Sequence, residues 1–281
     1  MSASQPRLVF VLAGQSNMAG RGSLDEADAV PPDSRVAAFS QVADKEAWQP
    51  AAHPLHPDTN SRKAGVGPGI SFAHELLRLA PRIAPSIGLV PCAFGGSELA
   101  RWEEGGDLFA AAVAKVQRSL DEGDATDVVA GILWHQGESD CSDAALATSH
   151  TVRLVAALQQ LRAALGSPAL PVVLGELGCF LDVTDPRFSH AAVVNAGMLT
   201  SPASLPGSSC VSAHGLDHRG DRLHFSSAAA EELGRRYAHA WLQLARPAEL
   251  LCEALPPPAP TCFPESADGV DATPTERAVV D

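Results

Sequence analysis

Short, continuous apolar runs alternate along this chain with longer segments whose apolar residues recur at helical spacing. The runs occupy residues 8–12, 86–94, 128–134, 171–174 and 210–213, and the helical segments occupy 68–80, 107–120, 143–165 and 226–244. A strand that is apolar on both sides is buried on both faces of its sheet, and parallel strands need long connections. The alternation therefore predicts an α/β fold, with a parallel sheet of about five strands between layers of helices.

Polar motifs follow several of these runs, where each strand is expected to end. They are GQSN at 14–17, GGS at 95–97 and HQGESD at 135–140, and a DRLH motif at 221–224 precedes the last helical segment. The carboxyl ends of parallel strands share one edge of a sheet, and ligands bind in the crevice beyond that edge. We therefore expect the four motifs to converge on one site.

Ser16 and His224 are candidates for a nucleophile and its base. A serine hydroxyl needs a base to remove its proton, and a carboxylate on the other ring nitrogen fixes the tautomer of that base. Asp221 lies three residues before His224, within reach of that nitrogen, and Glu138 is the alternative acid. Taken alone, Ser16 is more typical of a helix N-cap. Met18 replaces the second glycine of the α/β-hydrolase nucleophile motif, which argues against that family.

Two motifs offer hydrogen-bond donors for the oxyanion that forms during ester hydrolysis. Glycine lets backbone N–H groups approach a ligand closely, which fits Gly95 and Gly96. Gln136 follows a predicted strand, and its amide donates either to an oxyanion or to the neighbouring backbone. Glu138 has a second interpretation, as a group that does not touch the reacting atoms and instead holds the residues that do.

The motifs together resemble those of the SGNH-hydrolase superfamily. They are GQSNMAGRG at 14–22, GVGPGISFA at 65–73, GGS at 95–97, HQGESD at 135–140 and DRLHFS at 221–226. Within that superfamily, residues 8–245 are similar to the carbohydrate esterases of family six and the sialate O-acetylesterase-like proteins, including plant members. The resemblance implies a flavodoxin-like, three-layer α/β/α fold. It also implies a serine esterase, without metal or cofactor, that removes acetyl groups from carbohydrate through an acetyl-enzyme.

The same resemblance implies roles for individual residues. Ser16 is matched to the nucleophile and His224 to the base. The acid stays open between Asp221 and Glu138, with Asp221 favoured. The oxyanion hole is matched to the backbone N–H of Ser16, the backbone N–H of Gly95 or Gly96, and the side chain of Gln136.

Three residues near the motifs are candidates for substrate contacts, namely Asn17, Arg21 and Trp102. Trp102 either stacks on a sugar or anchors its own loop, and Arg21 either orders its loop or touches the substrate.

His214 and His218 precede His224 without the helical spacing of metal ligands, because glycines interrupt the segment. We therefore predict no metal site.

Two other functions fit the same motifs. One is a general short-acyl ester hydrolase with a non-sugar substrate, and the other is a non-catalytic carbohydrate-binding module. The joint presence of Ser16, Gln136, Asp221 and His224 argues against the module, because an enzyme that has lost its activity usually loses one of these residues.

Charge narrows the range of partners. The chain has 20 Lys and Arg against 33 Asp and Glu, a formal net charge of −13. This balance disfavours non-specific binding to nucleic acid or to anionic membranes.

No apolar run approaches the roughly 20 residues that span a bilayer. No targeting segment is recognised, so the expected location is cytoplasmic. The expected partner is an acetyl ester of a small molecule or glycan.

The motif order predicts one esterase domain over residues 1–252, because the site needs both its first and its last motif. Residues 253–281 hold six acidic residues, one basic residue and six prolines. Such a segment buries too little apolar surface to fold, so we expect a disordered, acidic tail.

The chain contains six cysteines, none in a C-x-x-C pair. We expect reduced thiols, because a domain of this size does not need disulfides.

Overall fold

The computed structural model describes residues 6–26, 32–42, 44–56, 64–82 and 86–245. The strands are β1 (Arg7–Gly14), β2 (Val36–Val42), β3 (Lys45–Pro50), β4 (Ser86–Pro91), β5 (Val128–His135), β6 (Val172–Gly175) and β7 (Ser208–Val211). The longer helices are α2 (Pro68–Leu79), α3 (Asp107–Asp121), α4 (Ala144–Ala164), α5 (Ala191–Thr200) and α6 (Ser227–Ala245). The short helical turns are α1 (Ser16–Ala19), η1 (Leu24–Glu26), η3 (Leu99–Trp102), η4 (Glu138–Asp140) and η5 (Ser201–Ala203).

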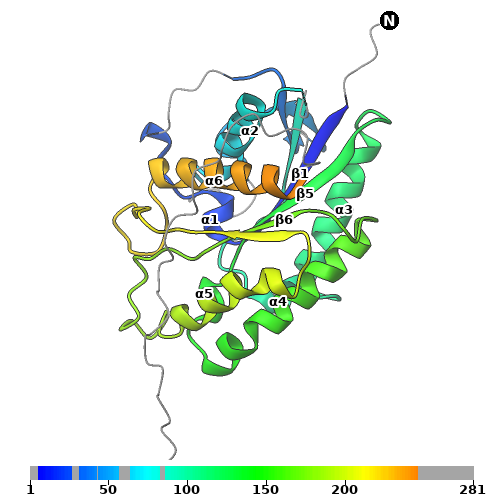
Figure 1. The fold of residues 1–281 in the computed structure, drawn as a ribbon. Coiled ribbons are helices and arrows are strands. Elements are labelled where there is room, and N and C mark those ends of the chain that lie inside the picture. The colour runs from blue at the N-terminus through cyan, green and yellow to red at the C-terminus, as the bar shows by residue number, and fades with distance from the viewer. Residues whose placement is uncertain (1–5, 27–31, 43, 57–63, 83–85, 246–281) are drawn as a thin grey trace, which may run out of the picture.

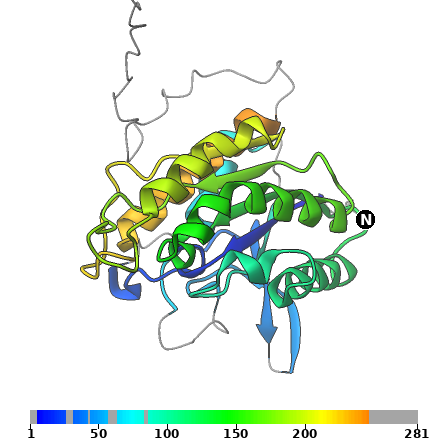
Figure 2. The same cartoon turned by 90° about the horizontal axis from the view of Figure 1, so that it is seen from below.

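The sheet is larger than the sequence analysis predicts. Its seven strands lie in the order β3-β2-β4-β1-β5-β6-β7, and every neighbouring pair is parallel except β2 and β3. Figures 1 and 2 show α2 and α6 on one face of the sheet and α3, α4 and α5 on the other. The three-layer α/β/α fold is therefore confirmed, with seven strands in place of about five.

The central strand β1 explains why the strands read as continuous apolar runs. Phe10 and Leu12 pack into the core on the α2 and α6 side of the sheet. Val9 and Val11 pack into the core on the opposite side, with α3, α4 and α5. Successive side chains of a strand point to opposite faces, so a strand between two helical layers needs apolar residues at every position.

All five predicted strands and all four predicted helical segments are present, although β7 begins at Ser208, two residues before the predicted run. The hairpin of β2 and β3 and the helix α5 were not predicted. β3 is an edge strand with charged residues, and its Glu46 pairs with Lys115 and Arg118 of α3 at 3.4 and 2.7 Å. Helix α5 is almost entirely apolar, with Asn195 and Thr200 as its polar residues, so it shows no helical period that sequence analysis could detect.

The cysteine prediction is wrong at one position. Cys92, Cys141 and Cys210 carry free thiols, but Cys179 is disulfide-bonded. The size of a domain indicates whether it needs disulfides, but carries no information on whether two thiols lie within bonding distance.

The end of the predicted domain, 246–252, and the predicted tail, 253–281, lie outside the described residues.

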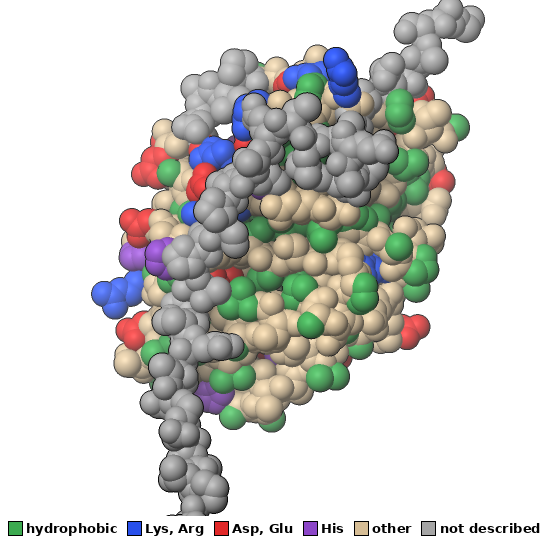
Figure 3. Space-filling model, viewed as in Figure 1, with side chains coloured by type: hydrophobic (Ala, Val, Ile, Leu, Met, Phe, Trp, Pro, Cys, Tyr) green, Lys and Arg blue, Asp and Glu red, His purple; other side chains and the backbone are tan. Residues whose placement is uncertain are grey.

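Figure 3 shows one face of the molecule, on which acidic and basic side chains are interspersed mainly around the rim. In the part of the chain that the structure describes, no helix combines the length and the apolar character required to cross a bilayer.

Phe10 provides a test of the core. Its ring packs edge-on against Phe72 and Trp241, with centroid distances of 4.7 and 5.1 Å. We expect Phe10→Ala to lower the free energy of unfolding by about 3–5 kcal/mol, because a cavity would remain between the sheet and the helical layer. Urea unfolding measures this loss. Val152→Ala on α4 is the matched control, because Val152 is 76% exposed. Equal losses in the two variants would contradict the prediction.

Candidate active site

Three of the four motifs lie side by side because β1 lies between β4 and β5. The hydrogen-bond ladder continues past the strand ends. The Gln15 N–H donates to the His135 carbonyl at 2.8 Å, and the Phe94 N–H donates to the Gly14 carbonyl at 2.9 Å. Gly14 has a φ of +126°, and a Cβ there would lie 2.1 Å from the His135 oxygen. Only glycine fits at this point, where the first motif leaves the sheet.

The fourth motif reaches the same edge on a short hairpin. His218 and Phe225 form an antiparallel bridge that closes it. Asp221 shapes the tip, because its Oδ1 accepts the backbone N–H groups of Leu223 and His224 at 3.0 and 2.8 Å. This turn around an aspartate side chain brings the carboxylate next to the imidazole three residues later.

Ser16, His224 and Asp221 form a continuous chain of hydrogen bonds. His224 Nδ1 lies 2.8 Å from Asp221 Oδ2, and His224 Nε2 lies 3.0 Å from Ser16 Oγ. An ionised carboxylate can only accept, so Nδ1 carries the proton and donates a hydrogen bond to Asp221. Nε2 is then left to accept from the Ser16 hydroxyl. In this arrangement an imidazole can remove a serine proton.

The Asp221 carboxylate is strongly stabilised in its ionised form. Partial burial raises the pKa of Asp221. The hydrogen bonds from the His224 backbone and ring and from the Leu223 N–H outweigh burial and lower the pKa to about 2. Arg219 Nε lies 3.3 Å from Asp221 Oδ2 and adds a positive neighbour. The group beside the imidazole is therefore an anion at all pH values near neutrality.

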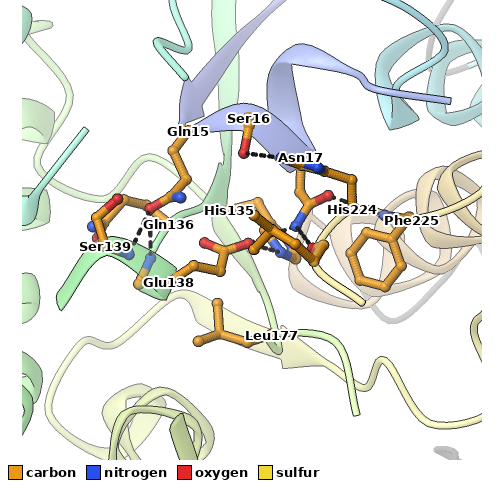
Figure 4. Close-up of polar contacts among 12 residues, drawn as sticks. Gln15, Ser16, Asn17, His135, Gln136, Glu138, Ser139, Leu177, His224 and Phe225 are labelled. Atoms are coloured by element: carbon orange, nitrogen blue, oxygen red, sulfur yellow. Dashed lines mark hydrogen bonds and ion pairs between the residues drawn. The ribbon is translucent and has the colours of Figure 1, made fainter. Parts of the chain in front are cut away.

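Glu138, the alternative acid, does not contact His224 through any hydrogen bond in the described structure. Its Oε1 accepts from Asn17 Nδ2 at 2.6 Å and lies 3.6 Å from His135 Nε2, as Figure 4 shows. Burial raises the pKa of Glu138, but the contacts with His135 and Asn17 outweigh it and leave the pKa below its usual value. Glu138 is therefore a buried anion behind the serine and the imidazole.

Asn17, a predicted substrate contact, has a different position from the one expected. Its Nδ2 donates to Glu138 Oε1 and, at 3.2 Å, to the Leu223 carbonyl. Its Oδ1 accepts the Phe225 N–H at 3.2 Å. The side chain is buried and its hydrogen-bonding groups are occupied by the protein, so the prediction of a substrate contact is corrected. Asn17 instead holds the backbone on both sides of His224.

Gln136, a predicted member of the oxyanion hole, is not among the residues that line the cavity of Ser16. Its Nε2 donates to the Ser97 carbonyl at 3.1 Å and to an Asp140 carboxylate oxygen, and the residue is fully buried. Both N–H groups are thus engaged, and neither is left for a ligand. The amide instead anchors the loop that contains Gly95 and Gly96.

Of the two roles that the sequence analysis left open for Trp102, the structure supports the anchor of a loop and not a contact with a sugar. Its indole N–H donates to Ser97 Oγ at 3.0 Å, and its ring packs edge-on against Trp134 at a centroid distance of 5.3 Å. The residue is only 2% exposed, so neither face of the indole is open to a sugar.

The site opens into a cavity of about 470 Å³. This volume suits a small ligand or one end of a larger one. The lining residues are Gln15, Ser16, Arg21, Gly95, Gly96, Glu98, Glu138, Ser139, Ser142, Arg187, Phe188, Leu223 and His224. Arg21 is on this wall, as the prediction of a substrate contact requires, and its Nη1 donates to the Gly20 carbonyl at 2.7 Å. Burial and the neighbouring Arg219 lower the pKa of Arg21.

Gln15 is a cavity residue that the sequence analysis missed. Its Oε1 accepts the backbone N–H groups of Gly137 and Ser139, each at 3.4 Å, which Figure 4 shows as two dashed lines. The available signal was its position directly before Ser16, at the end of a strand.

Within the described ranges, no cluster of three or more His, Cys, Asp or Glu side chains is placed to hold a metal ion.

Comparison with known proteins finds relatives over most of the chain. A family model described as carbohydrate esterase, sialic acid-specific acetylesterase, matches residues 6–243. A probable carbohydrate esterase of Arabidopsis thaliana is 31% identical over 251 residues, which are 84% of this chain and 91% of that protein. These matches confirm the predicted family and the prediction of a carboxylic ester hydrolase.

Two solved structures share the fold. A crystal structure of an Arabidopsis thaliana protein has a TM-score of 0.73 at 33% identity, and the match covers 85% of this chain and 99% of that one. A carbohydrate acetylesterase from Xanthomonas citri has a TM-score of 0.59 at 20% identity, over 83% of this chain and 55% of that one.

The low pKa of Asp221 can be measured. The pKa is depressed by folding, from 3.8 to about 2, so its contribution to stability is complete above the unfolded value and is lost as the pH falls towards 2. In His224→Ala the ring contact disappears but the backbone N–H remains. We therefore expect the pKa of Asp221 to rise without reaching 3.8. Carbon-13 NMR titration of labelled aspartate measures it. His214→Ala, on an exposed residue, is the control, and an unchanged pKa in His224→Ala would contradict the assignment.

Proposed function

The chain belongs to the carbohydrate esterase family described as sialic acid-specific acetylesterases, and we propose from this premise that it removes acetyl groups from acetylated carbohydrate. In this proposal Ser16 is the nucleophile, His224 is the general base and Asp221 orients the imidazole. The observation that carries it is the hydrogen-bond chain from Asp221 through His224 to Ser16, which ends in the cavity.

The reaction proceeds through an acetyl-enzyme. His224 Nε2 takes the Ser16 proton as Oγ bonds to the acetyl carbonyl carbon, and the carbonyl π electrons move to its oxygen. Collapse of this intermediate breaks the bond to the sugar oxygen, which leaves as an alcohol with the proton from His224. Water then attacks the acetyl carbon with His224 again as base. This step releases acetate and restores the Ser16 hydroxyl.

Backbone donors for the oxyanion lie next to the nucleophile. The N–H groups of Ser16, Gly95 and Gly96 have no hydrogen-bond acceptor among the residues that the structure describes. Gly95 lies beside Ser16, since a Cβ built on it would be 3.7 Å from the Ser16 Cβ. Preorganised donors of this kind stabilise the charge that develops on a carbonyl oxygen. This geometry favours an esterase over the alternative of a non-catalytic carbohydrate-binding module.

The nucleophile is tested by Ser16→Ala. We expect kcat for p-nitrophenyl acetate to fall by about 10⁴-fold or more, because the variant cannot form the acetyl-enzyme. Ser86→Ala, at the opposite end of the parallel strands, is the matched control and should retain full activity. Esterase activity that survives largely unchanged in Ser16→Ala would rule out this nucleophile.

The acid is tested by comparing Asp221→Asn with Glu138→Gln. We expect Asp221→Asn to lower kcat by about 10⁴-fold, because an amide no longer stabilises the imidazolium or enforces the tautomer. Glu138→Gln keeps an oxygen that can accept from Asn17, so its loss should be much smaller. The same kinetic assay ranks the two variants. A larger loss in Glu138→Gln would reassign the acid.

The substrate class is tested by acetate release from a panel of acetylated glycans, with the Ser16→Ala protein as blank. Acyl esters of increasing length distinguish the acetylesterase from the alternative, a general short-acyl hydrolase. We expect hydrolysis to fall steeply beyond acetyl and acetate to be released from at least one glycan. Efficient hydrolysis of longer acyl esters without activity on any glycan would favour the general hydrolase.

A further inference from the structure

We propose that the guanidinium of Arg21 supplies the positive charge that balances the oxyanion during ester hydrolysis, so that it lowers the barrier rather than anchoring the sugar. The inference rests on the proposed esterase function, because it assigns a charge to the transition state of that reaction. It starts from an imbalance of charge in the cavity. Arg21 lines the wall with Ser16, yet no carboxylate among the described residues pairs with it.

Arg21 is a nearly buried cation. The residue is 5% exposed, and a guanidinium is not deprotonated in proteins. Burial and the like charge of Arg219 both lower the pKa of Arg21, and no acidic group opposes them. A buried charge without a counter-charge is unfavourable, so the site is stabilised when an anion forms in the cavity.

Arg162 of α4 shows how a buried arginine is satisfied elsewhere in the same fold. It is 3% exposed, and its Nη1 and Nη2 donate to the carbonyls of Pro206 and Gly207, each at 2.9 Å. Arg21 has one such contact, from Nη1 to the Gly20 carbonyl at 2.7 Å. Its Nη2 has no acceptor among the described residues, which leaves this atom available to an oxygen in the cavity.

The Nη2 atom of Arg21 lies beside the reacting atoms. A Cβ built on Gly95 would overlap Nη2 and would lie 3.7 Å from the Ser16 Cβ, so the space of one methyl group separates the guanidinium from the nucleophile. The backbone of Arg21 is held by Arg219, whose Nη1 donates to the Arg21 carbonyl at 2.6 Å. A side chain at position 95 would therefore displace the guanidinium.

This position determines which anion Arg21 stabilises. The acetyl carbonyl must approach Ser16 Oγ, and in the proposed reaction its oxygen then lies near the N–H groups of Gly95 and Gly96. A carboxylate of the sugar placed at Arg21 Nη2 would occupy the space that the acetyl group needs. The anion that fits there is the one that forms on the carbonyl oxygen.

The contribution of this charge grows during the reaction. The carbonyl oxygen of the ester carries little charge in the ground state and nearly a full charge in the tetrahedral intermediate. A fixed cation therefore lowers the barrier more than it tightens substrate binding. Opposite unit charges several ångströms apart, at an effective dielectric constant of about 20, change a rate by about 10²-fold.

Arg21→Met removes the charge and keeps a long, unbranched side chain. We expect kcat for p-nitrophenyl acetate to fall by about 10²-fold, with KM changed only a few-fold. Arg21→Lys keeps the charge without the planar fork, and its kcat should stay within about tenfold of the wild type. Arg162→Met is the matched control. It removes a buried guanidinium that contacts the residues directly before β7, at the opposite end of the parallel strands, and should retain full activity.

The two substitutions at position 21 separate charge from structure. If Arg21 only ordered its own loop through the contact with Gly20, lysine and methionine would lower kcat by similar factors. Similar losses in the two variants would overturn the proposal. So would a folded Arg21→Met protein with kcat within about threefold of the wild type.

A charged ester tests the other anion that a guanidinium could bind. 4-Acetoxybenzoate is an acetyl ester that carries a carboxylate, whereas p-nitrophenyl acetate is neutral. We expect Arg21→Met to lower kcat for both esters by similar factors. A loss confined to KM for 4-acetoxybenzoate would show that Arg21 binds a substrate carboxylate instead, and would overturn the proposal.

A further measurement uses the wild-type chain and does not depend on how the variants fold. Methylboronic acid is neutral and trigonal. When Ser16 Oγ bonds to boron and His224 takes the serine proton, the adduct is a tetrahedral boronate anion. In a crystal structure of this adduct we expect Arg21 Nη2 within about 5 Å of a boronate oxygen. A guanidinium turned away from the boronate, or paired with Glu98 or Glu138, would overturn the proposal.

These measurements separate the inference from the function on which it rests. If the wild-type protein hydrolyses neither ester and forms no adduct at Ser16, the proposed function fails and the role of Arg21 fails with it. If the wild-type protein is active and Ser16→Ala is inactive, but Arg21→Met retains its kcat, only the role of Arg21 is wrong.

Discussion

The hydrogen bonds of Asn17 hold together parts of the chain that the sheet alone would leave apart. Ser16 follows β1, but the His224 hairpin follows β7, and β5 and β6 lie between these strands. Asn17 donates to the Leu223 carbonyl and accepts the Phe225 N–H, so it fixes the backbone on both sides of the imidazole. Each such bond contributes about 1 kcal/mol to stability. Their larger effect is to set the contact between His224 and Ser16.

Glu138 determines which way the Asn17 amide faces. A carboxylate only accepts, so the NH₂ group of Asn17 must point towards it, and Oδ1 is then directed at the Phe225 N–H. The buried charge of Glu138 is maintained by Asn17 and by the nearby His135, which lower its pKa against the effect of burial. A carboxylate that forms no hydrogen bond with His224 can thus help to set the position of its imidazole through Asn17.

Sequence patterns predicted the site where general rules of parallel sheets apply. Motifs at the ends of neighbouring strands must converge, and an aspartate three residues before a histidine can reach its ring. The sequence could therefore predict that Ser16, Asp221 and His224 lie together, as they do. The direction of a side chain beyond a strand end follows no such rule. Gln15 and Gln136 are both glutamines at strand ends, and only their partners reveal which one faces the cavity. The β2–β3 hairpin was missed because the edge strand β3 has no continuous apolar run and the apolar run of its partner β2 is short.

The separation of the two halves of the site has a consequence for synthesis of the chain. Residue 16 is made near the beginning and residue 224 more than two hundred residues later, after β7. A growing chain that has already formed β1, β4 and β5 still has a serine with no imidazole beside it. The contact between Ser16 and His224 therefore needs the hairpin to be in place. A chain that ends before this hairpin would contain Ser16 without the imidazole that contacts its hydroxyl.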